Sequence, residues 1–245
     1  MKIGIKVLCC LISLLVSSLS AQVTNVLYPV ADTHVRNAPG TENSNYGTAG
    51  YMYLYSYTGA RDFFGYVRFD LSSLGLGTQI LDASLTFTKV TTGSGERNDT
   101  LTAARFRTLG LLDVTGNTPQ DWGELTLTWN NKGAEYVSEN NYDPTRVVDF
   151  DGAAGNEVVT GGITATISGT NLVNFLNSRL AANGLATFIV DFATSESGRG
   201  FGLGTKENSD PNAWPRLTVV IPEPGTISLG VAAVALLLSR RKRAR

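Results

Sequence analysis

The chain has 245 residues, of which 42% are hydrophobic, with 20 Lys and Arg against 21 Asp and Glu. Seven of these cations (Lys2, Lys6 and five at the C-terminus) lie in two terminal segments, which leaves 13 against 21 carboxylates and a net charge of about −8. An acidic body argues against nucleic-acid binding, which needs a basic surface for phosphates. It also disfavours a strongly anionic ligand, unless a local basic patch or a bound cation compensates.

The first 21 residues have the pattern of a secretory signal peptide. Lys2 and Lys6 form a basic start, residues 7–16 are strongly apolar, and small residues at 17–21 suit cleavage. Both cysteines, Cys9 and Cys10, lie in this segment, so the mature protein is expected to contain no thiol and no disulfide.

The body from residue 22 to 221 has the length of one domain, and its many short apolar runs separated by turn residues predict strands. This pattern predicts an all-β fold, an antiparallel sandwich or jelly roll. The expected strands cover residues 26–35, 51–57, 64–71, 80–90, 101–109, 125–129, 146–150, 162–167, 185–192, 200–204 and 216–220.

One segment has helical periodicity instead. Leucines recur every four residues from position 172 to 180, Thr170 or Asn171 is a candidate N-cap, and Gly184 suits the left-handed position just past the end. We expect one short helix that covers an end or an edge of the sheets.

Residues 51–57 alternate strictly, which places Met52 and Leu54 on one face of a strand and tyrosines on the other. If the tyrosines face outward, they form a platform for sugar rings, whose C–H faces stack on aromatic planes. Alternatively, the rings stabilise cross-strand pairs or pack under a loop. The row consists of Tyr51, Tyr53, Tyr55 and Tyr57.

Two further residues are candidate sugar contacts. Arg68 would lie on the same sheet and contact carboxylated sugars, or it is a solvated surface charge. Trp129, followed by two asparagines, would offer a stacking ring at the rim of the sandwich, or it packs in the core while the asparagines make a turn.

A structural calcium site is a third hypothesis. Asp32 lies near the start of the domain, and Glu207 and Asp210 lie near its end, so adjacent first and last strands would bring their carboxylates together. The alternative is ordinary acidic residues at turns and strand ends. No cofactor is required by any motif.

Catalysis has little support in the sequence. The single histidine, His34, has no second histidine, and no cysteine in the expected mature body, with which to bind zinc, and no nucleophile elbow is present. Asp149 and Asp151 share one face, whereas glycosidases place their carboxylate pair across a cleft. We therefore expect a protein that is not an enzyme.

The C-terminal segment 222–245 combines three parts: Pro222-Glu223-Pro224, an uncharged run over 226–239, and a basic end that includes Arg240 and Arg241. The run is shorter than the roughly 20 residues that span a bilayer comfortably, and the basic end favours the cytoplasmic side. The arrangement resembles the PEP-CTERM sorting signal, which implies removal of the tail by an exosortase during export. A retained membrane anchor is the alternative.

The body resembles the DNRLRE domain, or carbohydrate-binding module family 96, from about residue 26 to 220. The resemblance is carried by ADTHVR at 31–36, NYG at 45–47, VRFDL at 67–71, ELTLTWNN at 124–131, and KENSD at 206–210 followed by PRL. It implies a jelly-roll sandwich and polysaccharide binding, with alginate the best-known ligand type. The chain differs from the family pattern in a longer segment at 141–161 and in its acidity.

Three functions are compatible with these features. The first is an exported surface or matrix protein that binds extracellular polysaccharide without catalysis. The second is a structural or adhesive protein of a biofilm matrix without a defined sugar site. The third, which has the least support, is a polysaccharide-degrading enzyme.

Overall fold

The structure is a computed structural model, and it describes residues 21–56, 63–75, 77–90, 104–108, 122–132, 164–192 and 199–223. No helix within these ranges has the length and apolar content needed to cross a membrane. Several predicted features lie outside them: residues 1–20 of the signal peptide, Tyr57, the strand at 146–150, the pair Asp149 and Asp151, and the tail with Pro224, Arg240 and Arg241.

The described residues are mostly β-structure with one α-helix, α2, at Thr170–Ala182, which confirms the prediction at this level. Two 3-10 turns, η1 at Ser72–Leu74 and η4 at Pro211–Ala213, complete the elements. The strands are β1 (Gln22–Leu27), β2 (Ala31–Arg36), β3 (Tyr51–Ser56), β4 (Phe63–Asp70), β5 (Asp82–Val90), β6 (Ala104–Thr108), β7 (Thr164–Ser168), β8 (Leu185–Phe192), β9 (Arg199–Gly204) and β10 (Arg216–Pro222).

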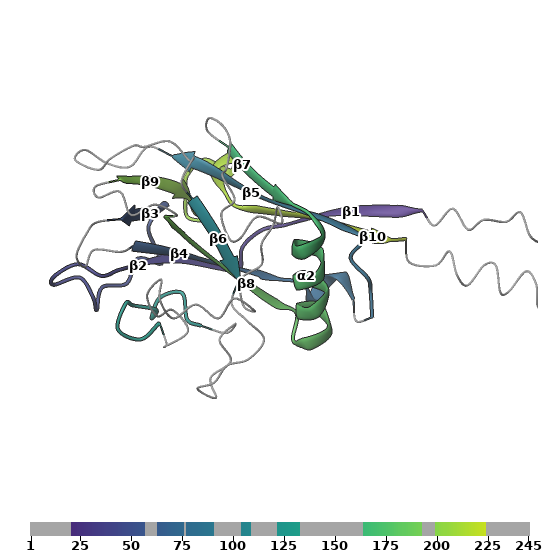
Figure 1. Ribbon diagram of the computed structural model, residues 1–245, viewed down its shortest axis with the longest axis horizontal. Coiled ribbons are helices and arrows are strands. Elements are labelled where there is room, and N and C mark those ends of the chain that lie inside the picture. The colour runs from purple at the N-terminus through teal and green to yellow at the C-terminus, as the bar shows by residue number, and fades with distance from the viewer. Residues whose placement is uncertain are drawn as a thin grey trace, which may run out of the picture. The chain divides into compact units, whose positions relative to one another are not determined.

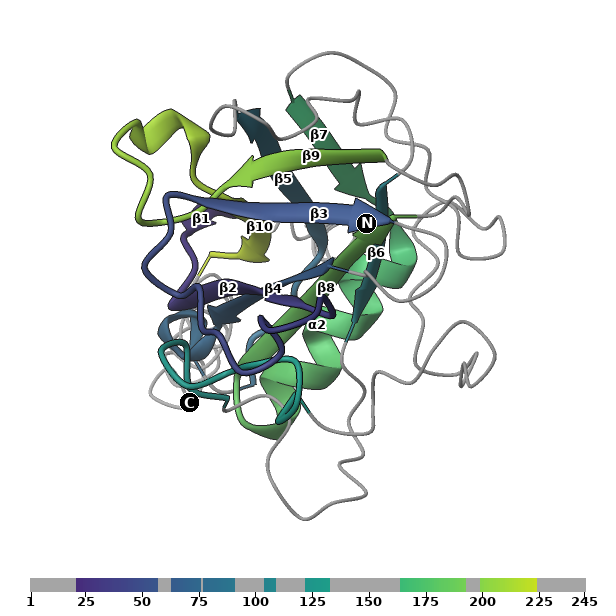
Figure 2. The ribbon, with the colours of Figure 1, turned by 90° about the vertical axis from the view of Figure 1, so that its left-hand side faces the viewer.

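The strands follow the order β1-β10-β5-β9-β3-β4-β8-β6, with β2 paired to β4 and β7 paired to β5. The pairs that link β2 to β10 with one another are antiparallel. β3 pairs with β9 along its whole length, but it meets β4 at the single pair Tyr55 and Phe63. Figure 2 shows β9 and β3 passing above β2, β4 and β8. The path therefore turns sharply between β3 and β4.

Two strand predictions need correction. The strand expected over 26–35 is two strands, β1 and β2, interrupted at Pro29, which has no backbone N–H to give to a ladder. The strand expected over 125–129 is a turn, because Thr126 and Leu127 both donate their N–H to Gly123 O, at 3.1 and 2.9 Å. These donors are used locally and are not available to a neighbouring strand.

The core lies where the inner faces of the strands meet. Met52 and Leu54 of β3 are fully buried, and a Cβ atom at Gly65 of β4 would lie 3.1 Å from Met52 Sδ and 3.2 Å from Leu54 Cδ2. Each fully buried side chain of this size contributes about 1.5–3 kcal/mol relative to exposure. Other fully buried members are Val67, Phe69, Leu85, Phe87, Phe188, Val190, Phe201 and Leu203.

Helix α2 packs against β5 and β8 with its predicted leucines buried (Figure 1). The helix begins after Gly169, which offers no side-chain cap, so the predicted cap at Thr170 or Asn171 is wrong. Its end matches the prediction: Gly184 has φ of +77° and donates its N–H to Arg179 O at 2.9 Å.

Residues 122–132, which we call the cap segment, lie beside β2 and β4 (teal in Figure 2). Leu127 of this segment joins a buried cluster with Val35, Phe64, Tyr66 and Ile189, and Trp122 and Trp129 pack against that cluster. The cap segment thus covers apolar side chains of β2, β4 and β8 from outside the main core.

Contacts within the chain group Thr24–Val220 into one compact unit, which holds the sheet, the helix and the cap segment. Residues 21–23 and 221–223 belong to a second unit, in which Glu223 N donates to Ala21 O at 2.8 Å.

Candidate functional site

The tyrosine row of β3 lies opposite a row of glycines on β9. Paired residues of neighbouring antiparallel strands share a face, and in this pairing every second residue of β9 lacks a side chain. The pairs are Tyr51 with Gly204, Tyr53 with Gly202, and Tyr55 with Gly200. We call these six residues the tyrosine face. It lies opposite the buried Met52 and Leu54 along β3, as the alternation in the sequence predicts.

The rings of Tyr53 and Tyr55 occupy the space beside Gly200, whereas Ala213 of η4 occupies the space beside Gly204. A Cβ atom at Gly200 would lie 2.7 Å from Tyr55 Cδ2 and 2.8 Å from Tyr53 Oη. The rings of Tyr53 and Tyr55 are 5.9 Å apart at 23°, and both contact Phe63 at 5.7 and 5.5 Å. Tyr53 is 5% exposed, whereas Tyr51 and Tyr55 are half-buried. Cross-strand packing therefore accounts for Tyr53, while Tyr51 and Tyr55 keep accessible surface.

Arg36 extends the tyrosine face toward the loop before β3. Its guanidinium carbon lies 4.3 Å from the ring centroid of Tyr46, 5.0 Å from Phe63 and 5.8 Å from Tyr53. These distances are within the range of cation–π attraction. Arg36 and Tyr46 were not among the predicted site residues, because nothing in their spacing links them to the tyrosine row.

His34 of β2 packs against Tyr46 and binds Arg36. It is 1% exposed, its ring stacks on Tyr46 at 4.3 Å and 17°, and its Nε2 accepts a hydrogen bond from Arg36 Nε at 3.0 Å. Burial, together with the charge of Arg36, lowers the pKa of His34 well below its usual value. The imidazole is therefore neutral, and it orients Arg36.

The structure separates Arg68 and Trp129 from the tyrosine face. Arg68 lies under the cap segment, where its Nη1 donates to Trp122 O at 2.8 Å. Trp129 stacks on Phe64 at 5.3 Å and 25°, and Lys132 Nζ lies 3.9 Å from the Trp129 ring centroid. The indole is thus in contact with Phe64 and Lys132 and packs against the buried cluster, which favours a packing role.

The other two tryptophans fix loops. Trp122 donates its Nε1 hydrogen to Thr187 Oγ1 at 3.1 Å, and Trp214 donates its own to Asn208 O at 2.8 Å. Trp214 also meets Tyr28 edge to face at 5.9 Å.

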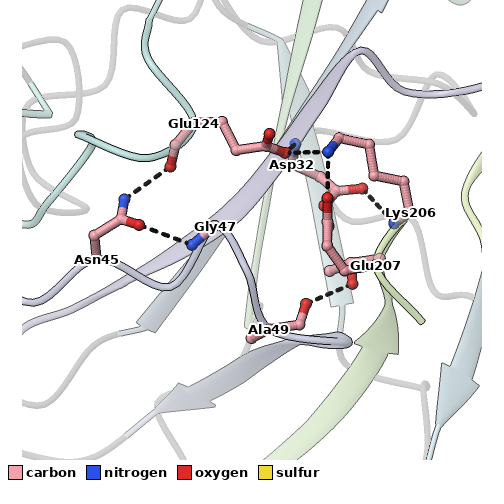
Figure 3. A network of polar contacts seen from close by, with 8 residues as sticks. Asp32, Asn45, Gly47, Ala49, Glu124, Lys206 and Glu207 are labelled. Atoms are coloured by element: carbon pink, nitrogen blue, oxygen red, sulfur yellow. Dashed lines mark hydrogen bonds and ion pairs between the residues drawn. The ribbon is translucent and has the colours of Figure 1, made fainter. Parts of the chain in front are cut away.

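A second group of polar side chains joins β2, the cap segment and the turn after β9 (Figure 3). One carboxylate oxygen from each of Asp32, Glu124 and Glu207 lies within 4.8 Å of the others, and we call these residues the carboxylate cluster. Asp32 N donates to Glu124 Oε1, and Lys206 N donates to Asp32 Oδ2, both at 2.8 Å. Lys206 Nζ lies 2.9 Å from Glu124 Oε1 and also contacts Glu207 Oε1.

Burial and neighbouring charges shift the pKa values of Asp32 and Lys206 in the carboxylate cluster. Burial is the main cause that raises the pKa of Asp32 to about 8, and the neighbouring Glu207 raises it further, against the hydrogen bond from Lys206 N. Burial would lower the pKa of Lys206, but hydrogen bonds to Glu207 and Glu124 outweigh this effect and raise it. The ammonium and the Glu carboxylates therefore stabilise each other, while the burial cost of Asp32 is compensated only in part by Lys206.

Of the three residues predicted to hold calcium, the structure brings Asp32 and Glu207 together and leaves Asp210 apart. Asp210 is exposed and caps η4, with its Oδ1 accepting from Asn212 N at 2.9 Å. Glu124 takes its place in the cluster. Spacing in the sequence did not indicate Glu124, because 92 residues separate it from Asp32.

The family model for carbohydrate-binding module family 96 matches residues 23–201, well over half of the 245 residues. The chain belongs to carbohydrate-binding module family 96. A search of curated proteins found no match.

The family 96 match includes the tyrosines of β3 together with Arg36, Tyr46, Asp32 and Glu124. It ends at residue 201, earlier than the end near 220 that the sequence resemblance indicated. Lys206 and Glu207 therefore lie beyond the matched part of this carbohydrate-binding module, although they complete a cluster that begins within it.

Proposed function

We propose that this chain is a non-catalytic polysaccharide-binding protein and that the tyrosine face, with Arg36 and Tyr46, is its binding surface. Membership of a carbohydrate-binding module family is the observation that carries this proposal. The accessible rings of Tyr51 and Tyr55 supply stacking surface, and Arg36 supplies hydrogen-bond donors for sugar oxygens.

The geometry around Gly200 supports this surface. Position 200 has no side chain, and the rings of Tyr53 and Tyr55 fill the space that a side chain there would need. A larger residue at 200 would therefore displace both rings. Phe63 contacts both rings and the Arg36 guanidinium lies over the ring of Tyr53, and such contacts reduce the conformational entropy that binding would otherwise cost.

The fold that fits this function is a jelly-roll sandwich. Two features support it: the path of strands turns at the single β3–β4 pair, and Met52 and Leu54 of β3 pack face to face on Gly65 of β4. Two layers with inner faces in contact have this property.

Export would deliver the module to its ligand. We infer a signal peptide over 1–21, the binding domain over 22–221, and a sorting signal over 222–245 that a membrane exosortase removes, which places the protein at the cell surface or in the extracellular matrix. The basic tail and the short apolar run support this inference.

The test is affinity electrophoresis of the exported protein in gels that contain neutral and uronic-acid polysaccharides. Retention in at least one gel is expected, and Tyr55→Ala should abolish it. Tyr28→Ala is the matched control, because Tyr28 is an exposed tyrosine that follows β1 and does not belong to the tyrosine face. Wild-type mobility that no polysaccharide changes would instead support a structural or adhesive role, and release of reducing ends would support an enzyme.

A further inference from the structure

The carboxylate cluster is built by parts of the chain that are far apart in sequence and rigidly held. Asn45 Nδ2 donates to Glu124 O at 2.8 Å, and a Cβ atom at Gly47 would lie only 2.3 Å from the same oxygen. Glu124 is thus fixed by its backbone, and its carboxylate is directed at Asp32 N. Figure 3 shows the three acidic side chains converging with Lys206 between them.

Two oxygens of the cluster have no hydrogen-bond partner among the described residues. Asp32 is 0% exposed, and its Oδ1 is buried without a partner, as is Glu207 Oε2. A buried carboxylate oxygen without a partner is costly, and native structures rarely leave one without an ion or water.

The charges in the cluster do not balance. When all three carboxylates are ionised, they face one ammonium, that of Lys206, and two negative charges remain without a counter-charge. A divalent cation at the centre of the cluster offsets two negative charges, whereas the ammonium offsets one. The Lys206 side chain is 25% exposed, so its ammonium can move into solvent when an ion enters.

The ligand atoms indicate the class of ion. All three side chains offer oxygen, and no nitrogen or sulfur ligand takes part, which selects hard cations. Calcium accepts six to eight oxygens in flexible geometry, whereas magnesium demands near-octahedral geometry and retains its waters.

We propose that Asp32, Glu124 and Glu207 bind one calcium ion, which replaces the Lys206 ammonium as the counter-charge of the cluster. The ion cross-links β2, the cap segment and the turn after β9. It therefore stabilises the cap segment over the apolar side chains of β2 and β4. This role does not depend on polysaccharide binding, because none of these residues belongs to the tyrosine face.

The exported protein, freed of metal with a chelator, is titrated with CaCl2 by isothermal titration calorimetry, and its thermal unfolding is followed in parallel. One ion should bind per chain. At a free calcium concentration 100 times the Kd, the Tm should rise by about 5–11 °C for a domain of this size. Amide exchange in the cap segment should slow on calcium addition.

Three variants sharpen the test. Glu207→Gln keeps the size of the side chain and should weaken calcium binding at least about tenfold, since it removes a charged ligand. Lys206→Met removes the competing ammonium and should tighten calcium binding. Asp210→Asn is the matched control, because Asp210 is acidic and near in sequence but not in the cluster, and it should leave the affinity unchanged.

Absence of binding heat and of any Tm shift with calcium up to about 10 mM, above the range of weak extracellular calcium sites, would overturn the proposal. Equal affinity for MgCl2 would overturn the choice of calcium. Weaker calcium binding in Lys206→Met would show that the Lys206 ammonium does not compete with the ion. If Glu207→Gln fails to fold, Glu124→Gln should show the same loss of calcium affinity. Calcium binding without any polysaccharide retention would leave this site standing and refute the proposed function alone.

Discussion

Replacing Gly200 by alanine tests the packing of the tyrosine face. The new Cβ atom would lie 2.7 Å from Tyr55 Cδ2, 2.8 Å from Tyr53 Oη and 3.0 Å from Leu54 O. Carbon atoms pack best at separations of about 3.5–4.0 Å. The tyrosine side chains can rotate, but Leu54 O belongs to the backbone of the paired strand β3. The strands must therefore separate locally while both rings are displaced.

Such overpacking costs about 1–3 kcal/mol in the free energy of unfolding. Chemical denaturation should show this loss, and affinity electrophoresis should show weaker retention by polysaccharide, because the rings leave their positions. Gly50→Ala is the control: its nearest neighbour, Asn208 Cα, is at 3.5 Å, an ordinary contact. Its stability should change by less than about 0.5 kcal/mol.

A double variant separates the clash with the Tyr55 ring from the clash with the β3 backbone. Combining Gly200→Ala with Tyr55→Ala removes the closest clash, so the two substitutions should be less than additive by at least about 0.5 kcal/mol. If Gly200→Ala unfolds at the wild-type denaturant concentration and is retained like the wild type, the rings of Tyr53 and Tyr55 do not depend on the glycine at 200.

Three further predictions concern other parts of the chain. Asn45→Ala removes hydrogen bonds to Glu124 O and Leu127 O and should lower the free energy of unfolding by about 1–3 kcal/mol, with faster amide exchange in the cap segment; unchanged exchange would contradict its role. Arg68→Met should destabilise the protein by about 1–3 kcal/mol through the lost bond to Trp122 O, yet leave polysaccharide retention intact; lost retention in a folded variant would place Arg68 in the binding site. Mass spectrometry of the exported protein should find its C-terminus near Pro224, whereas an end at Arg245 would indicate a retained anchor.

The alternation on β3 and the helical period of α2 were readable from the sequence because each is a local property. A strand that packs on one side must alternate, and Met52 and Leu54 do so against the tyrosines. The turn at 125–129 also alternates, with Leu125 and Leu127, yet Leu125 is 63% exposed. Hydrogen bonds to Gly123 O and to the Asn131 side chain hold that segment in a turn instead of a strand.

The sites depend on contacts that no local pattern encodes. Glu124 reaches Asp32 across 92 residues, and Lys206 reaches it across 174. The sequence could place Asp32 and Glu207 near opposite ends of the domain, but not indicate which third carboxylate joins them. Likewise, the sequence does not show that the glycines of β9 lie opposite the tyrosines, because this depends on the register of β3 with β9.

Binding of polysaccharide on the tyrosine face can be measured by hydroxyl-radical footprinting of the protein with and without the polysaccharide that retains it. Oxidation of Tyr55 and Tyr46 should slow when the polysaccharide binds, while that of the exposed Tyr28 should not change. Protection of Tyr28 with unchanged oxidation of Tyr55 would place the binding surface elsewhere and contradict the account.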